Sequence, residues 1–281
     1  MAAKPAVVDS RNYVARFATL SWLSLAQLVR SPSHSRRAEA ARRAARHVLW
    51  LTAGLGAAII VLMYVIDAWE IGQMPKRGTP SLWWIRILTD FGKDEYVLSA
   101  LGVLLIAVAL TAPAMRGIQR SLLLGLGTRL QFLFLAVAVS NLVTEVLKYC
   151  VGRGRPFVSG EANVFHFSHF AGNPAYASFP SGHATTAFAL AFAISAVWPG
   201  TRFAMAVYAV IIAATRLVLL AHHPSDVVAG ALIGIIGAMF VRYWFAARRL
   251  GFAIQRDGSI VPLVGPSSGR LKRVARGAFA P

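Results

Sequence analysis

Cysteines and acidic residues are scarce in this chain of 281 residues. Only 14% of the residues are charged, against about a quarter in an average soluble protein. The single cysteine, Cys150, excludes an intrachain disulfide and a cluster of thiolate metal ligands. The sequence also has no repeat of fixed period and no group of carboxylates suited to Mg²⁺. What remains is 57% hydrophobic, with a mean hydropathy of +0.58, and is typical of a membrane protein.

Six apolar runs approach the roughly 20 residues that a helix needs to cross a bilayer. They are residues 48–66, 96–115, 129–147, 183–198, 203–221 and 227–245. The fourth run is the shortest, at about 24 Å of helix against the ~30 Å of the apolar layer. The chain is therefore predicted to form an all-α polytopic membrane helix bundle of about six transmembrane helices. Its parts are a basic N-terminal segment (1–47), the six-span domain (48–245) and a basic tail (246–281).

The basic residues predict how this bundle is oriented. Of the 29 Lys and Arg residues, 21 fall on the side of the two termini, together with three acidic residues. The opposite side carries 8 basic and 8 acidic residues. The positive-inside rule therefore places both termini in the cytoplasm. Most of the net charge of +18 then reflects topology and attraction to anionic lipids, and no aromatic-interleaved module indicates binding to nucleic acid.

The two terminal segments, residues 1–47 and 246–281, offer no catalytic constellation. We expect no cleaved signal peptide, because basic residues extend over the first 46 positions and no cleavage site follows an early apolar core. The stretch YVARFATLSWLSLAQLV, residues 13–29, is expected to be an interfacial helix on the cytoplasmic leaflet, with disorder as the alternative. Residues 246–281 are expected to form a flexible tail. Trp69, Trp83 and Trp84 are expected to be interfacial aromatics, and the segment SLWWIRILTDFG, residues 81–92, is expected to lie flat on the outer surface.

Three polar clusters, distant in sequence, fall on the side opposite the termini. They are KYCVGRGRP (148–156), FPSGHATT (179–186) and RLVLLAHHPSD (216–226). Ionisable groups at the mouth of a membrane helix are costly and usually functional. Their convergence on one face predicts a site built between helices.

Each cluster suits a phosphate. Lys148, Arg155 and Arg216 supply cations, and arginine grips phosphate oxygens in a bidentate fork. A helix that begins at Gly182 would present free backbone N–H groups to an anion. A histidine can attack phosphorus or protonate a leaving oxygen, and Asp226 can accept a hydrogen bond from a histidine ring. Because Pro224 disfavours helix at residue 223, the last turn before it is expected to unwind.

These residues resemble the motifs of the type 2 phosphatidic acid phosphatase superfamily of membrane lipid phosphatases. The motifs are K-x6-RP, PSGH and [S/T]R-x5-H-x3-D, and they match Lys148 to Pro156, Pro180 to His183 and Thr215 to Asp226. Threonine replaces the usual serine at 215 and keeps the hydroxyl. The motifs cover about 80 residues, and the six-span layout extends the resemblance to about 200.

The resemblance implies a metal-independent phosphoric ester hydrolase without a cofactor. It implies that His222 attacks phosphorus to form phosphohistidine, that Asp226 orients His222, and that His183 protonates the departing lipid oxygen. The implied phosphate-binding residues are Lys148, Arg155, Ser181, Gly182 and Arg216. Cys150, Arg153 and Glu145 are interpreted as structural.

The implied substrate is a lipid phosphomonoester or diphosphate in the outer leaflet of a bacterial inner membrane, at the periplasmic face. Phosphatidate-like lipids, phosphatidylglycerophosphate, undecaprenyl diphosphate and a lipid A phosphate all remain candidates. A lipid phosphotransferase that uses the same site is an alternative. A vanadate-dependent haloperoxidase is disfavoured by the six spans. An anion transporter is disfavoured because neither duplicated halves nor broken helices are evident.

Overall fold

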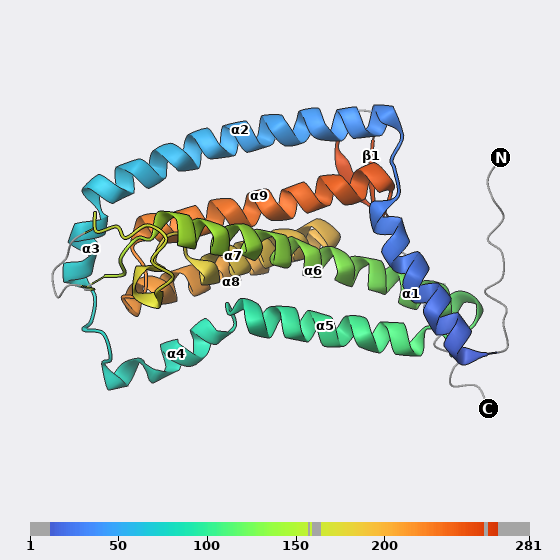
Figure 1. Ribbon diagram of the computed structural model, residues 1–281, viewed down its shortest axis with the longest axis horizontal. Helices are drawn as coiled ribbons and strands as arrows, with labels where there is room; N and C mark the ends of the chain where they lie inside the picture. Colours follow the sequence, from blue (N-terminus) through green and yellow to red (C-terminus); the bar gives the residue numbers. More distant parts are fainter. Residues whose placement is uncertain (1–11, 157, 159–163, 256–257, 264–281) are drawn as a thin grey trace.

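The computed structural model describes residues 12–156, 158, 164–255 and 258–263, and most of them are helical (Figure 1). The longer helices lie side by side along the long axis of the molecule. The elements are α1 (Tyr13–Val29), α2 (His34–Val65), α3 (Asp67–Gln73), η1 (Pro80–Leu82), α4 (Trp83–Asp90), α5 (Asp94–Thr111), α6 (Gly117–Val151), η2 (Pro174–Tyr176), α7 (Gly182–Val197), η3 (Pro199–Thr201), α8 (Arg202–Val218), α9 (Pro224–Arg248), β1 (Phe252–Ile254) and β2 (Ile260–Pro262).

The helices confirm the predicted all-α membrane bundle. Among the described residues, five helical segments are long and apolar enough to cross a membrane, and the 16-residue α7 is a shorter apolar helix. Large apolar side chains such as Trp50, Ile60 and Phe203 are exposed on the outside, as lipid contact requires. α2 begins at His34, well before the predicted span, because its Ala- and Arg-rich start consists of strong helix formers. The predicted segment boundary at residues 47 and 48 thus lies inside one continuous helix.

α9 is the most buried of the spanning helices and packs against α7, α2 and α6. Its glycines allow α7 to approach closely. A Cβ atom at Gly230 would lie 2.4 Å from the carbonyl oxygen of Ser181, and one at Gly234 would lie 2.5 Å from that of Thr185. This backbone contact places the start of α9 beside the start of α7.

Substitution of Gly234 by alanine is therefore expected to destabilise the protein. The new methyl group would meet backbone atoms of α7, and overpacking of this kind costs about 1–3 kcal/mol. Gly102→Ala in α5 is the matched control, because a Cβ there meets nothing within 4 Å. Thermal unfolding in detergent should show a lower midpoint for Gly234→Ala and no loss for Gly102→Ala. Equal midpoints for the two variants would contradict the close packing of α9 on α7.

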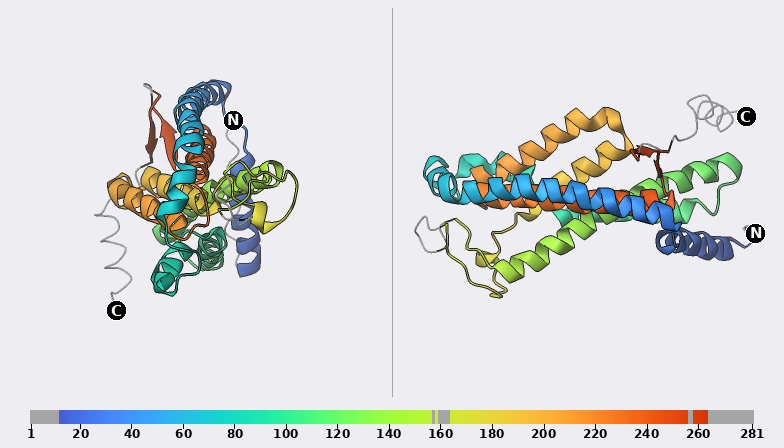
Figure 2. Two further views of the ribbon diagram at one scale, coloured as in Figure 1. Left: turned by 90° about the vertical axis from the view of Figure 1, so that its left-hand side faces the viewer. Right: turned by 90° about the horizontal axis from the view of Figure 1, so that it is seen from above.

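The first and last described elements share one end of the bundle (Figures 1 and 2). α1 confirms the helix predicted over residues 13–29. The prediction of a flexible tail is wrong for residues 246–255 and 258–263. α9 continues to Arg248, and β1 pairs with β2 in an antiparallel hairpin. Phe252 is buried against Phe132 and anchors the hairpin in the core. The rest of the predicted tail, residues 264–281, lies outside the described residues.

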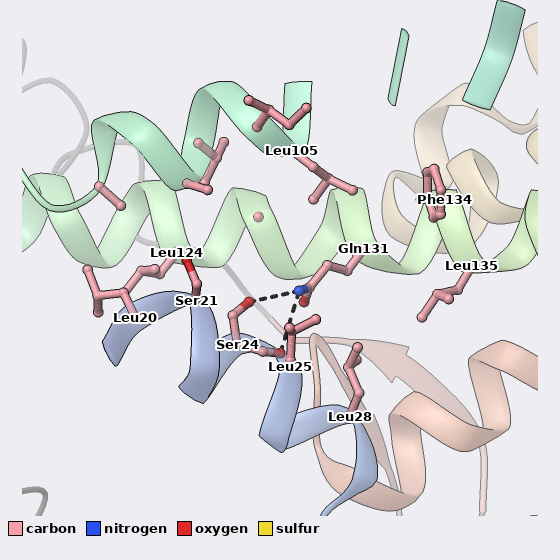
Figure 3. Close-up of a pocket in the computed structure, with 15 residues that line it drawn as sticks. Leu20, Ser21, Ser24, Leu25, Leu28, Leu105, Leu124, Gln131, Phe134 and Leu135 are labelled. Carbon is pink, nitrogen blue, oxygen red and sulfur yellow. Dashed lines mark hydrogen bonds between the residues drawn. The ribbon is translucent and has the colours of Figure 1, made fainter. Parts of the chain in front are cut away.

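α1 packs across α5 and α6 (Figure 3). Leucines of all three helices line a cavity of about 390 Å³ between them. Polar contacts also cross the interface: Gln131 Nε2 donates a hydrogen bond to Ser24 Oγ at 2.7 Å, and the Tyr13 hydroxyl donates to Leu110 O at 2.6 Å. α1 is thus attached to the spanning helices by apolar packing as well as by hydrogen bonds.

Candidate active site

The three polar clusters meet at the end of the bundle opposite α1 and the hairpin (Figure 1). Backbone hydrogen bonds join the second cluster, or the residue just before it, to the other two clusters. Ser178 N donates to Arg153 O and Ser181 N donates to Asp226 O, both at 3.0 Å. The predicted convergence of the clusters on one face is therefore confirmed.

The first cluster begins at the C-terminus of α6. Gly152 ends the helix in the left-handed conformation, with φ of 60°, and any Cβ there would lie 1.8 Å from the carbonyl oxygen of Ser168. Only glycine fits this turn. In the last turn of α6, Lys148 forms an ion pair with Glu145. The Lys148 Nζ also lies 3.1 Å from where a Cβ of Gly182 would be, so the cation sits over the start of α7.

Arg155 and Arg216 come from different motifs and line the same pocket. Arg155 Nη1 donates to Ala221 O at 3.3 Å, which connects the first motif to the third. Burial lowers the pKa of Arg155 from its ordinary value. Arg216 Nη1 donates to Thr89 Oγ1 at 2.8 Å, while its Nε is buried without a partner among the described residues. Both guanidinium groups thus keep donors available for an anion.

The second cluster forms the N-terminus of α7. Ser181 is the N-cap, and its hydroxyl oxygen accepts from Ala184 N. Gly182 follows as the first helical residue, with its N–H free of an intrahelical partner. His183 Nε2 is buried and has no hydrogen-bond partner among the described residues. The His183 ring lies within electrostatic reach of four cations, namely Arg216, Lys148, Lys93 and Arg155.

The third cluster is the turn between α8 and α9. α8 ends at Val218, and Leu220 has φ of 47°, so the chain unwinds before His222 as predicted. His222 is only 2% exposed, and its Nδ1 lies 2.7 Å from the carbonyl oxygen of Ser178. A carbonyl oxygen can only accept, so Nδ1 carries the proton and Nε2 carries the lone pair. Burial, with Arg216 and Arg155 nearby, lowers the pKa of His222 well below its ordinary value.

The expected bond between Asp226 and the His222 ring is not formed. Pro224 starts α9, which makes His223 the N-cap and Asp226 the third residue of the helix. The Asp226 carboxylate therefore turns back in a capping box and accepts from His223 N at 2.9 Å and from His223 Nδ1 at 3.1 Å. It also accepts from Ser178 Oγ at 2.6 Å. Asp226 thus holds Ser178, the residue whose carbonyl orients His222.

Arg153 connects this turn to the end of the first span. It is fully buried and makes five hydrogen bonds. Nη1 donates to Asp226 Oδ1 at 2.6 Å and to Ser225 Oγ at 2.7 Å, and Nη2 donates to Asp67 Oδ2 at 2.9 Å. The Arg153 Nε and the second N–H of Nη2 both donate to the carbonyl oxygen of Val164, at 3.0 and 2.8 Å. Arg153 is structural, as interpreted from sequence, but its carboxylate partners place it directly behind the turn that carries His222.

A comparison with protein families finds a match to the part of the chain that carries this site. The family model described as the PAP2 superfamily matches residues 129–250, a range that contains all three motifs. The putative undecaprenyl-diphosphatase YbjG of Escherichia coli (strain K12) is 33% identical over 161 residues, which are 56% of this chain and 71% of that protein. The chain belongs to the PAP2 superfamily.

Two further relatives of this PAP2 chain are lipid A 1-phosphatases. Those of Rhizobium johnstonii and Rhizobium etli are 37% and 36% identical over 127 residues, or 45% of this chain. The match spans about half of their length, 52% and 55% respectively. A crystal structure of a transmembrane PAP2 type phosphatidylglycerolphosphate phosphatase from Bacillus subtilis has a TM-score of 0.47 and 19% identity, and covers 69% of this chain and 94% of that one.

Some residues around this PAP2 site were missed from sequence. Asp67 was not singled out, although an acidic residue directly after an apolar run is a signal of function or of a buried partner. Arg77, Arg86 and Lys93 lie near the motif arginines or His183 and belong to no motif. In the part of the chain that the structure describes, no group of three or more His, Cys, Asp or Glu side chains is placed to hold a metal ion.

Proposed function

We propose that this PAP2 protein is an integral-membrane phosphoric ester hydrolase that releases phosphate from a lipid through a phosphohistidine at His222. The observation that carries the proposal is the His222 ring, whose Nδ1 is held by the Ser178 carbonyl. This leaves Nε2 as a neutral nucleophile beside Arg155 and Arg216. The names of the relatives, which include a diphosphatase and lipid A phosphatases, support a phosphorylated lipid as substrate.

The reaction has two steps. First, His222 Nε2 attacks phosphorus, a P–N bond forms, and the bond between phosphorus and the lipid oxygen breaks. The charge of the bound phosphate favours the protonated form of His183, which gives its proton to that departing oxygen. Second, His183 takes a proton from water, whose oxygen attacks the phosphohistidine. Inorganic phosphate leaves and His222 is regenerated.

Phosphoryl transfer depends mainly on positioning and electrostatic stabilisation. Lys148, Arg155 and Arg216 neutralise the phosphate oxygens and the charge that develops on them. At the start of α7, the Ser181 hydroxyl and the Gly182 N–H add donors, and the helix dipole favours the same anion. The apolar exterior of the bundle keeps the lipid chains in the bilayer while the headgroup reaches the site.

Phosphate release from a panel of lipid phosphates in detergent tests this proposal, and activity is expected to survive excess EDTA. The motif cations and the helix N-terminus already supply the positive charge that a metal ion would bring. Orthovanadate, which can adopt the five-coordinate shape of the transition state, is expected to inhibit. Activity that is lost with EDTA and restored by Mg²⁺ would contradict the proposed site.

We also propose that both termini are cytoplasmic and that the site faces the periplasm from a bacterial inner membrane. The positive-inside distribution of Lys and Arg supports this orientation. In spheroplasts with Cys150→Ser, an impermeant thiol reagent should label Lys76→Cys beside the site. Ser35→Cys at the other end should react only after the membrane is opened. The opposite labelling pattern would contradict this orientation and place the site on the cytoplasmic side.

A further inference from the structure

A cavity of about 360 Å³ adjoins the proposed active site, and four arginines line it. Arg155 and Arg216 belong to the motifs. Arg77 and Arg86 do not, and come from the segment between the first two spans. The cavity also reaches Ala221, the residue before His222. It is therefore continuous with the position at which the motif arginines would hold the reacting phosphate.

Arg77 and Arg86 are not neutralised by the described part of the protein. Neither guanidinium group forms an ion pair or a hydrogen bond there. Arg77 also lies within electrostatic reach of both Arg155 and Arg216. Like charges gathered around one cavity repel one another, and a bound polyanion would remove that repulsion.

The element that carries Arg86 is fixed to the site. On α4, Thr89 Oγ1 accepts from Arg216 Nη1 at 2.8 Å and is hydrogen-bonded to Thr215 Oγ1 at 3.0 Å. Trp83 and Trp84, in the first turn of the same helix, are 63% and 55% exposed. Exposed tryptophans favour the depth of lipid headgroups. The arginine-lined cavity is thus expected to lie at the depth of the lipid headgroups, where the phosphate of a lipid is located.

We propose that Arg77 and Arg86 form a second phosphate subsite and that the preferred substrate is a lipid diphosphate. The inference rests on the proposed function. The terminal phosphate occupies the motif site, and the phosphate next to the lipid lies between Arg77 and Arg86. His222 Nε2 attacks the terminal phosphorus, and the bond from that phosphorus to the bridging oxygen breaks. That oxygen receives the His183 proton, so the products after hydrolysis are inorganic phosphate and a lipid monophosphate.

The two arginines serve the diphosphate alone in this arrangement. A phosphomonoester is already matched by Lys148, Arg155 and Arg216, and places no group between Arg77 and Arg86. A diphosphate adds a second phosphate directly beside the first, where two further guanidinium groups can each donate charge-assisted hydrogen bonds. Loss of each such contact is expected to cost roughly tenfold in kcat/KM.

The test compares farnesyl diphosphate and farnesyl monophosphate in detergent micelles at physiological ionic strength, which screens general attraction. In the Arg77→Gln/Arg86→Gln variant, kcat/KM should fall about 100-fold for the diphosphate and less than about threefold for the monophosphate. The single variants Arg77→Gln and Arg86→Gln are each compared with Lys76→Gln. This control also removes one exposed positive charge, but Lys76 does not line the cavity. Inorganic pyrophosphate should inhibit the wild type more strongly than orthophosphate does, and this difference should vanish in the double variant.

Several results would overturn the subsite. Equal losses on both substrates would mean that the arginines attract anions in general, and no loss on either would mean that they bind nothing. Wild-type protein that hydrolyses the monophosphate far better than the diphosphate would overturn the inference and leave the proposed function standing. A wild type that releases phosphate from neither compound, nor from any other lipid phosphate, would overturn both.

Discussion

Replacement of His222 by alanine is expected to lower phosphate release by at least roughly 10³-fold. The substitution removes the nucleophile while Lys148, Arg155 and Arg216 still bind the substrate. We therefore expect KM to change little and kcat to carry the loss. Steady-state phosphate release from a lipid substrate, in detergent-purified protein with an unchanged elution profile, measures both constants.

The adjacent histidine provides the matched control. His223 is fully buried, but its Nδ1 faces Asp226 and it caps α9. Asparagine is a favourable N-cap residue, so His223→Asn is expected to fold and to keep activity within about tenfold of the wild type. Equal losses in folded His222→Ala and His223→Asn proteins would contradict the assignment of His222 as the nucleophile.

Replacement of Arg153 by methionine is expected to destabilise the protein by about 3–5 kcal/mol. The change leaves the carboxylates of Asp67 and Asp226 buried without their shared cation. The change also removes a hydrogen bond that holds Asp226 in place. Asp226 in turn holds Ser178, whose carbonyl orients His222, so the position of His222 is expected to loosen. Thermal unfolding in detergent should show the loss of stability, and kinetics on the folded fraction should show a lower kcat with a nearly unchanged KM.

Arg153→Lys separates charge from geometry in this network. Lysine keeps one positive charge but cannot form the planar fork that reaches both carboxylates. The stability of the Arg153→Lys protein is expected to lie between that of the wild type and that of Arg153→Met. If Arg153→Met unfolds at the wild-type temperature and turns over at the wild-type rate, Arg153 does not position the turn.

The sequence predicted the parts of the site that depend on local chemistry. The apolar runs predicted the spanning helices, and the order of the runs along the chain predicted which loops share one end of the bundle. The short run at 183–198 matched the 16-residue α7. The unwound turn before His222 followed from Pro224, because a residue before proline disfavours helix. Each of these predictions rests on the local sequence of a segment or on the order of the segments along the chain.

The parts that the sequence did not predict depend on contacts between distant segments. The pair of Asp67 and Arg153 spans 86 residues, and nothing in either segment specifies the other. Asp226 was expected to bind His222, but capping of α9 directs its carboxylate to His223. The hairpin after α9 was not predicted, because its strands have only three residues each and Phe252 anchors it in the core.

Trapping the covalent intermediate tests the central claim most directly. Purified protein is mixed with a lipid substrate that carries radiolabelled phosphate, quenched in alkali within the first turnovers, and digested for peptide mapping. The account predicts an acid-labile, alkali-stable label on the peptide that contains His222. The label should be absent from His222→Ala and present in His223→Asn. Hydrolysis that proceeds without a labelled protein, or with the label on another residue, would contradict the account.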